Sequence, residues 1–187
     1  MFYAFIYKIM CTLLFVCIYE RKVYLGYCTF FSRANRKIKL TDWNPEYPKL
    51  ASEQMRLVTN LIEKKGCLDT FHGESSYHIG STSILGMMGK PSVDFAVITK
   101  DMLPDFDDDL LHDLGELGYE YCGPAPHMMD KNKDHWFFNH HDPELGYTMH
   151  LVSKDGAIGL EKLILFRDYC NSNEDARARY TNAKRAA

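Results

Sequence analysis

The sequence lacks the paired cysteine and histidine motifs that usually hold a structural or catalytic metal. No C-x-x-C pair occurs, so neither a zinc knuckle nor a disulfide framework is indicated, and free thiols in a reducing compartment are the simpler interpretation. The H-E-x-x-H and H-x-x-x-H spacings of zinc sites are absent as well. Four closely spaced histidines are therefore predicted to be loop residues rather than zinc ligands: His127, His135, His140 and His141.

The sequence also has little excess charge of either sign. Lysine and arginine together number 22, aspartate and glutamate 25, and the formal net charge is -3 at pH 7. Domains whose main function is to bind nucleic acid usually present a basic face, so this balance argues against that function. With 187 residues, of which 46% are hydrophobic, the chain is long enough to bury one sizeable core.

A long uninterrupted apolar run is absent too. Residues 2–19 are apolar or aromatic apart from Lys8 and Thr12, but a run of this length barely spans a bilayer, and no small-residue cleavage site follows it. We predict that residues 1–36 form an extension outside the domain and that the protein is cytoplasmic. The alternative is a membrane anchor through residues 2–19, which would leave the domain on the cytoplasmic side because basic residues follow.

The sequence does contain a loop of small residues between two strand-like segments. Residues 77–83 read Tyr-His-Ile-Gly-Ser-Thr-Ser, and residues 90–97 read Lys-Pro-Ser-Val-Asp-Phe-Ala-Val. A Gly-Ser turn that opens a helix leaves N–H donors without partners, and such a turn favours phosphate or another anion. Asp94, on the strand that follows, could hold a divalent metal against those phosphates.

These two segments resemble the signature of the GrpB family, whose members share a nucleotidyltransferase-like fold and are sometimes fused to dephospho-CoA kinase. The resemblance is carried by residues 78–86, by Lys90 and Pro91, and by Asp94, and three further blocks fit it: residues 42–48, 148–152 and 165–169. It covers residues 37–187 and implies one GrpB-like domain. Because residues 175–185 resemble the family's penultimate helix, we expect this domain to be truncated at its C-terminus.

The resemblance implies a site for a nucleotide or another phosphorylated small molecule, and nucleotidyl transfer as the reaction. We predict that Asp94 and His150 are catalytic and that Asp94 is the ligand of a weakly bound Mg²⁺ whose binding needs the nucleotide. The ligand or its phosphates would be bound by a larger set: His78, Gly80, Ser81, Thr82, Ser83, Lys90 and Arg167.

The acidic motif of such a reaction is incomplete in this sequence. Two or three carboxylates normally neutralise the charge of the phosphates, whereas the position two after Asp94 is Ala96. The family tends to place a His-x-His motif on the later strand, but the first of these positions is Thr148, and only His150 remains. The alternative prediction is therefore a non-catalytic ligand-binding or interaction module.

Each candidate residue also has a structural interpretation that needs no ligand. The turn at Gly80 could simply cap the short helix that follows, Lys90 could be a solvated turn residue, and His78 could bond a carbonyl at the edge of the core. Arg167 and Asp168 could form a structural ion pair or a lock between a helix and a loop. The aromatic residues 136–138 are predicted mostly to fill the core.

The spacing of apolar residues predicts an α+β fold, with a nucleotidyltransferase-like mixed sheet and helices packed on one face of it. Helices are predicted at residues 48–65, 103–117, 159–169 and 173–185. Strands are predicted at residues 77–79, 92–99, 119–122, 136–139 and 147–152.

Overall fold

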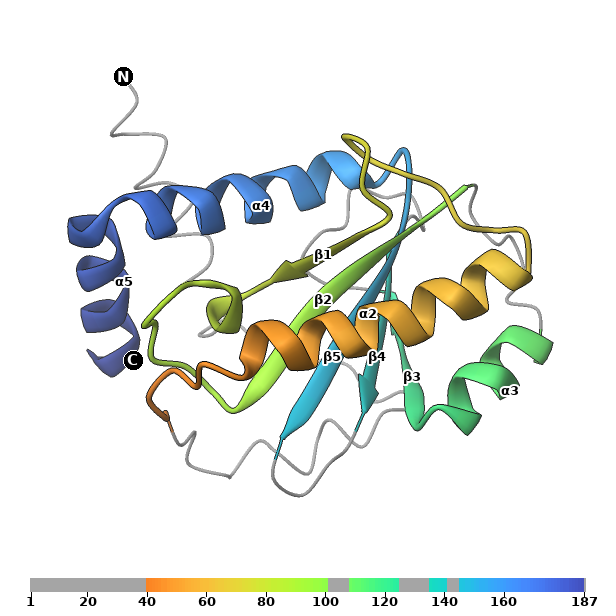
Figure 1. Cartoon of the computed structure of the whole chain (residues 1–187), viewed down its shortest axis with the longest axis horizontal. Coiled ribbons are helices and arrows are strands. Elements are labelled where there is room, and N and C mark those ends of the chain that lie inside the picture. Colours follow the sequence, from red (N-terminus) through yellow and green to blue (C-terminus); the bar gives the residue numbers. More distant parts are fainter. Residues whose placement is uncertain (1–39, 101–107, 125–134, 141–144, 187) are drawn as a thin grey trace.

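The computed structural model describes residues 40–100, 108–124, 135–140 and 145–186 (Figure 1). The predicted extension at residues 1–36, the start of the helix predicted at 103–117, and His127 and His141 all lie outside these ranges. Within the described ranges, the helices and strands follow one another in the order that the apolar pattern predicts.

A five-stranded mixed sheet forms the centre of the described fold. Its strands are β1 Ser76–Ile79, β2 Ser92–Thr99, β3 Tyr119–Pro124, β4 His135–His140 and β5 Gly146–Ser153. They lie in the order β1-β2-β5-β4-β3, with β2 parallel to β5 and the other neighbouring pairs antiparallel. The predicted α+β class with a mixed sheet is confirmed.

The helices of the described residues are α2 Tyr47–Lys64, α3 Asp108–Glu116, α4 Ala157–Ser172 and α5 Glu174–Ala186, and a short 3-10 helix, η2, spans Ser81–Ser83. A proline in the first turn of α2 costs no hydrogen bond, because N–H groups at that position have no partner in the helix. The chain leaves α2 through Gly66, whose φ of 71° suits glycine. The bounds of α2 and α5 are within one residue of those predicted, whereas α4 is longer at both ends.

One face of the sheet is covered by α2 and α3, as Figure 1 shows. Alternate residues of a strand point to the same face, so this core takes every second residue of β2 and β5. The buried side chains that the helices and these two strands contribute are Val58, Ile62, Phe95, Val97, Leu110, Leu114, Met149 and Leu151.

Part of the other face is covered by α4, so the prediction that the helices pack on one face is wrong. Ala96 and Ile98 of β2 and Val152 of β5 are buried there against Ala157 and Leu160 of α4. The physical reason is that α4 carries apolar side chains on all sides, so its pattern does not reveal which side the core will take. β2 is consequently buried on both faces from Phe95 onward.

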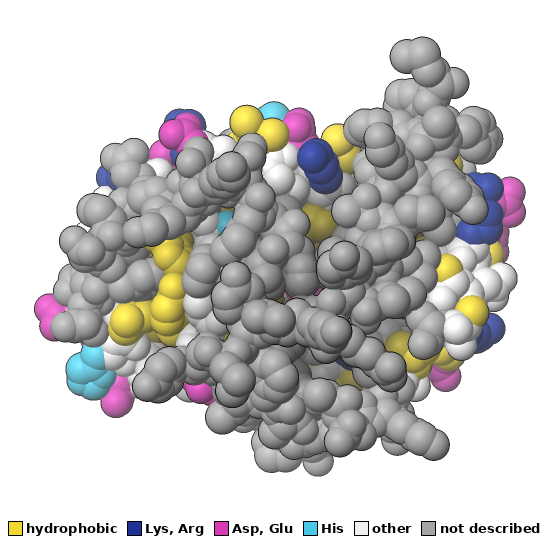
Figure 2. All heavy atoms as spheres, turned by 180° about the vertical axis from the view of Figure 1, so that it is seen from behind, with side chains coloured by type: hydrophobic (Ala, Val, Ile, Leu, Met, Phe, Trp, Pro, Cys, Tyr) yellow, Lys and Arg dark blue, Asp and Glu magenta, His cyan; other side chains and the backbone are white. Residues whose placement is uncertain are grey.

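Figure 2 views the molecule from the side opposite α2. Among the described residues visible from that side, basic and acidic side chains are interspersed around the rim (Figure 2). Across the ranges that the structure describes, no helix combines the length and the apolar character needed to cross a membrane.

The packing of α4 can be tested with two leucines of that helix. Leu160 is fully buried against the sheet, whereas Leu165 is 61% exposed. We predict that Leu160→Ala lowers the free energy of unfolding by about 2–5 kcal/mol, because it leaves a cavity under the helix. Leu165→Ala should change it by less than about 0.5 kcal/mol. Urea denaturation of both variants measures this, and equal losses would show that α4 does not pack by Leu160.

Candidate functional site

The turn after β1 brings Gly80 directly against Asp94. Gly80 has φ 72° and ψ -169°, a backbone conformation that is essentially restricted to glycine. A Cβ atom at Gly80 would lie 2.3 Å from Oδ2 of Asp94, so the carboxylate packs on the bare backbone of the turn. The contact arises because Ile79, the last residue of β1, pairs with Asp94 on β2. The structure thus brings together the loop and the acid that the sequence predicted.

Side-chain hydrogen bonds hold the carbonyl groups of Gly80 and of η2. Nε1 of Trp43 donates to the Thr82 carbonyl at 2.9 Å, and Nδ2 of Asn171 donates to the Ser83 carbonyl at 3.1 Å. The Ser83 hydroxyl donates to the Gly80 carbonyl at 2.7 Å. The N–H groups of Ser81 and Thr82 stand at the start of this helix, where helix geometry supplies no acceptor.

Thr82 and His78, both predicted as ligand-binding residues, support the turn from within. Thr82 is 1% exposed, and its Oγ1 lies 3.0 Å from Nε2 of His78. Burial, and secondly the charge of Arg167, lower the pKa of His78 to about 4, so its ring is neutral at pH 7. Direct contact of these two side chains with a ligand stays a prediction.

Arg167 ties α4 to β1. Its Nη1 donates to the His78 carbonyl at 2.8 Å, and its Nε donates to Oδ1 of Asp168 at 2.7 Å. This geometry matches the interpretation of Arg167 as a lock between a helix and its neighbour. A contact between Arg167 and an anionic ligand stays a prediction.

A row of polar side chains extends across the sheet from Asp94. The strand register places Thr148 of β5 beside Asp94, and Asn139 of β4 beside Thr148. The Thr148 hydroxyl lies 3.4 Å from Oδ1 of Asn139 and 3.4 Å from the Ser92 hydroxyl. The row joins one carboxylate to neutral donors and acceptors, which suits a ligand with both charged and polar groups.

Burial raises the pKa of the Asp94 carboxyl to about 6. A hydrogen bond from Thr148 and the charges of Lys184 and Lys90 oppose this shift without cancelling it. The carboxylate is therefore charged at pH 7, but its proton affinity is well above that of a solvated aspartate.

His150, predicted as catalytic, is hydrogen-bonded to another histidine. Nδ1 of His150 lies 2.6 Å from Nε2 of His135, and the ring of Phe137 packs edge-on to His150 at 5.2 Å. Burial lowers the pKa of both rings, to about 3 for His150 and about 4 for His135, so the pair is neutral at pH 7 and one ring donates to the other.

The prediction that His135 and His140 are loop residues is wrong. Both lie on β4, which begins one residue before the predicted strand, and His135 is 8% exposed. No group of three His, Cys, Asp or Glu side chains in the described ranges is placed to hold a metal.

Ala96 occupies the strand position where the second acid is missing. Ala96 lies on the same face as Asp94, as strand alternation predicts, but it is fully buried under α4. Glu120 is in the same row as Asp94, three strands away on β3. Magnesium needs octahedral oxygen ligands that usually include one or two carboxylates and substrate phosphates. Asp94 with neutral hydroxyls does not fit a tightly bound magnesium ion.

The sequence analysis missed Lys184, the lysine of α5 that reaches this site. A Cβ atom at Gly89 would lie 3.5 Å from Nζ of Lys184 and 2.4 Å from the Ser81 hydroxyl. The ammonium and the hydroxyl therefore both lie over the backbone of Gly89, beside the turn. No sequence signal singles out this residue, because a lysine in the last turn of a helix is common.

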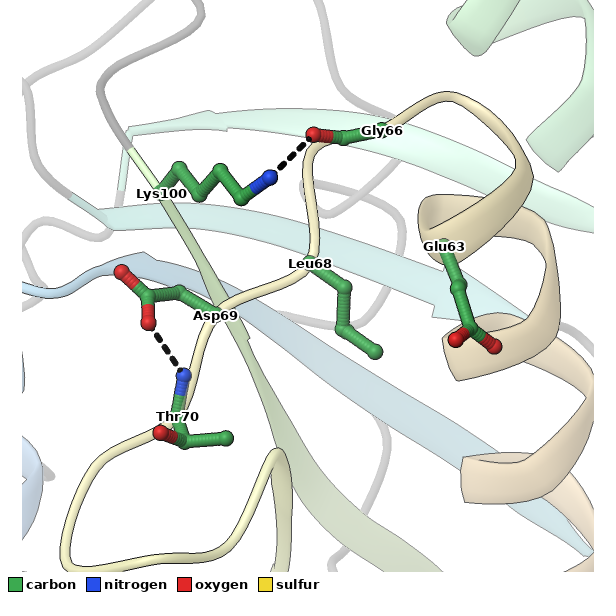
Figure 3. Close-up of a pocket in the computed structure, with 6 residues that line it drawn as sticks. All are labelled: Glu63, Gly66, Leu68, Asp69, Thr70 and Lys100. Atoms are coloured by element: carbon green, nitrogen blue, oxygen red, sulfur yellow. Dashed lines mark hydrogen bonds between the residues drawn. The ribbon is translucent and has the colours of Figure 1, made fainter.

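A second concave region lies at the opposite end of β2 and carries no comparable chemistry. It is a recess of about 290 Å³ beside the end of α2 (Figure 3), and six residues line it: Glu63, Gly66, Leu68, Asp69, Thr70 and Lys100. Lys100 donates to the Gly66 carbonyl at 2.9 Å, and the Thr70 N–H donates to Asp69. Several of its polar groups thus already have partners in the fold.

Comparisons with known proteins agree with the fold. A family model described as GrpB protein matches residues 37–187. A UPF0157 protein of Halalkalibacterium halodurans is 25% identical over 151 residues, which cover 81% of this chain and 69% of that protein. A UPF0157 protein of Streptomyces coelicolor is 34% identical over 131 residues, which cover 68% of this chain and 63% of that protein. The chain thus spans less than two thirds of the length of this second relative.

A solved structure is similar as well. The conserved protein GrpB from Enterococcus faecalis superposes with a TM-score of 0.62 at 23% sequence identity, over 77% of this chain and 79% of that one. At this level of identity the similarity establishes the shared fold and leaves the chemistry of the site to be argued from its residues.

The raised pKa of Asp94 has a consequence for stability. Its folded-state pKa of about 6 exceeds the ordinary value of 3.8, so its contribution to stability falls as the pH rises through this window. We predict that Asp94→Asn raises the free energy of unfolding at pH 8 by on the order of 2 kcal/mol and that the gain vanishes toward pH 4. Urea unfolding at several pH values measures this, and a gain independent of pH would contradict the assignment.

The contact between Gly80 and Asp94 can be tested against a matched glycine. Gly86 has a similar φ of 70° but open space around it, whereas Gly80 faces the carboxylate. We predict that Gly86→Ala costs about 1–2 kcal/mol of stability from backbone strain alone. Gly80→Ala should cost clearly more, since the methyl group must displace Asp94. Thermal unfolding compares the two variants, and equal losses would mean that the carboxylate does not pack there.

Proposed function

The chain belongs to the GrpB family, and we propose that it binds a nucleotide or another phosphorylated small molecule at the turn formed by Gly80 and residues 81–83. The observation that supports this most directly is the Gly80 turn, whose bare backbone packs against the Asp94 carboxylate immediately before the first N–H groups of η2. The nucleotidyltransferase-like fold of the family is consistent with this ligand class, although a fold alone does not define a reaction.

The charges around the turn favour an anion. Lys184 and Lys90 both lie close enough to Asp94 to oppose the rise in its pKa, so two ammonium groups surround one carboxylate. Backbone N–H groups and lysines together are a common way to hold phosphate, with lysine acting as a point charge. The Ser81 hydroxyl adds a donor on the same side of Gly89.

Nucleotidyl transfer is the leading enzymatic hypothesis for this site. In that reaction an acceptor oxygen attacks the α-phosphorus of a nucleotide, the bond to the β-phosphate breaks and pyrophosphate leaves. Asp94 would orient the acceptor or hold a hydrated Mg²⁺ that the phosphates also bind, and His150 would act as a neutral hydrogen-bonding group beside it. These roles, like the weak magnesium site, stay predictions.

A non-catalytic binding module is the second candidate, and one observation favours it. The strand position that would carry the second acid is Ala96, which is sealed among apolar side chains under α4. A carboxylate there would be costly to bury, so β2 offers one acid where transfer normally uses two or three. Binding of the ligand without its turnover is the expected behaviour of such a site.

A ligand panel tests the proposal on the full chain. We predict that at least one of ATP, GTP, CTP, AMP or pyrophosphate stabilises the protein, by about 2.7 kcal/mol when the ligand is at a hundredfold excess over its Kd. Gly80→Ala should abolish this gain, since the added methyl group fills the turn, whereas Gly86→Ala should keep it. Thermal shift and calorimetry provide the measurement. Absence of any stabilisation by the panel would refute the proposal.

A separate assay distinguishes the two candidates. Release of pyrophosphate from a nucleoside triphosphate that binds, lost in Asp94→Asn, would identify an enzyme. Tight binding with no release in the presence of Mg²⁺ and varied acceptor alcohols would favour the binding module.

A further inference from the structure

We propose that Lys184 is the phosphate-binding cation of this site and that it supplies the positive charge that a divalent metal would otherwise provide. The inference rests on the proposed function and deepens it: the ligand is a phosphorylated molecule whose binding does not require magnesium. Two independent observations support it, the place that α5 gives to the lysine and the incomplete acidic motif around Asp94.

The geometry places the lysine over the turn. Nζ of Lys184 and Oγ of Ser81 approach the same point above Gly89, at 3.5 Å and 2.4 Å from the position of an absent Cβ atom. Gly89 has no side chain to separate these two groups. A phosphate oxygen between them would accept a charge-assisted hydrogen bond from the ammonium and a second bond from the hydroxyl.

Packing of α5 fixes the direction of this side chain. Nζ of Lys184 lies over the ring of Tyr180 at 5.1 Å, and that ring packs edge-on against Phe166 at 5.1 Å. One turn of helix away, the Thr181 hydroxyl lies 3.3 Å from Sδ of Met87, in the loop that leads from η2 to Gly89, and 3.0 Å from the Arg177 carbonyl. Figure 1 shows α5 beside this loop. The helix therefore holds both the lysine and the loop that it faces.

The charges of the site favour a lysine over a metal ion. Asp94 is the carboxylate of the turn, while Ala96 and Thr148 stand where further ligands would be expected. Two ammonium groups near Asp94 repel a divalent cation and attract a phosphate. Magnesium dehydrates reluctantly and gains little from a single carboxylate. A fixed ammonium needs no such ligands.

A purely structural role is the competing explanation. Lysine in the last turn of a helix interacts favourably with the helix dipole, and its stem can rest on an aromatic ring. Arg185 is the next residue, carries the same charge in the same last turn and is exposed. It therefore shares the dipole role but not the position over Gly89, which makes it the matched control.

The experiment measures the Kd of ATP and of inorganic tripolyphosphate by calorimetry at pH 8, with EDTA and separately with Mg²⁺. The full chain is compared with Lys184→Met, which keeps the apolar stem, with Lys184→Arg, and with Arg185→Ala. We expect Lys184→Met to weaken both ligands about tenfold or more in either condition, Lys184→Arg to restore part of the loss, and Arg185→Ala to change Kd by less than about twofold. Thermal unfolding of each variant confirms that it is folded.

Asp94→Asn distinguishes binding by the lysine from binding by a metal ion. If the lysine carries the binding, loss of a neighbouring negative charge should tighten tripolyphosphate in EDTA by about threefold or more. If a metal carries the binding, the same variant should weaken it in Mg²⁺, and the full chain should bind only when Mg²⁺ is present. That result, or equal effects of Lys184→Met and Arg185→Ala, overturns the inference while the proposed function survives. Failure of the full chain to bind any phosphorylated probe overturns both.

Discussion

The contact between Gly80 and Asp94 is the constraint on which the rest of the site depends. A strand carboxylate can pack against a turn only where the turn has no side chain, and the positive φ of Gly80 then directs the chain into η2. Burial in this part of the fold raises the pKa of Asp94 to about 6. One glycine thus determines both how the chain enters η2 and how closely the neighbouring acid approaches the turn.

The division of the second sheet face follows from where α4 packs. The helix covers Ala96, Ile98 and Val152 and leaves the row of Asp94, Thr148 and Asn139 outside its apolar contact. A second carboxylate two residues after Asp94 on β2 would lie under the helix, at Ala96. The packing of α4 on this face thus explains why Asp94 has no acidic neighbour on β2. Because a second carboxylate would be costly to bury there, the arrangement favours a lysine-based phosphate site over a metal centre.

The last described helix, α5, packs against both α4 and the loop beside the site. α5 packs through Tyr180 on Phe166 of α4 and through Thr181 on Met87 of the loop. Lys184 extends from this packed surface over Gly89. Lys184 and the residues that contact the loop thus belong to the same helix. Changes in the packing of α5 should therefore alter the position of Lys184 relative to the turn.

The sequence by itself determined the α+β class, the bounds of β2, the family, and the pairing of a Gly-Ser turn with Asp94, because these depend on local patterns and on a motif within about twenty residues. It also predicted that position 96 shares a face with Asp94, which follows from strand alternation. Only the tertiary structure decided that α4 covers that position, that His135 is a strand residue bonded to His150, and that Lys184 faces the turn from the other end of the domain. These features depend on contacts between residues far apart in the chain. The apolar pattern of α4 and the common placement of a lysine at a helix end do not specify such contacts.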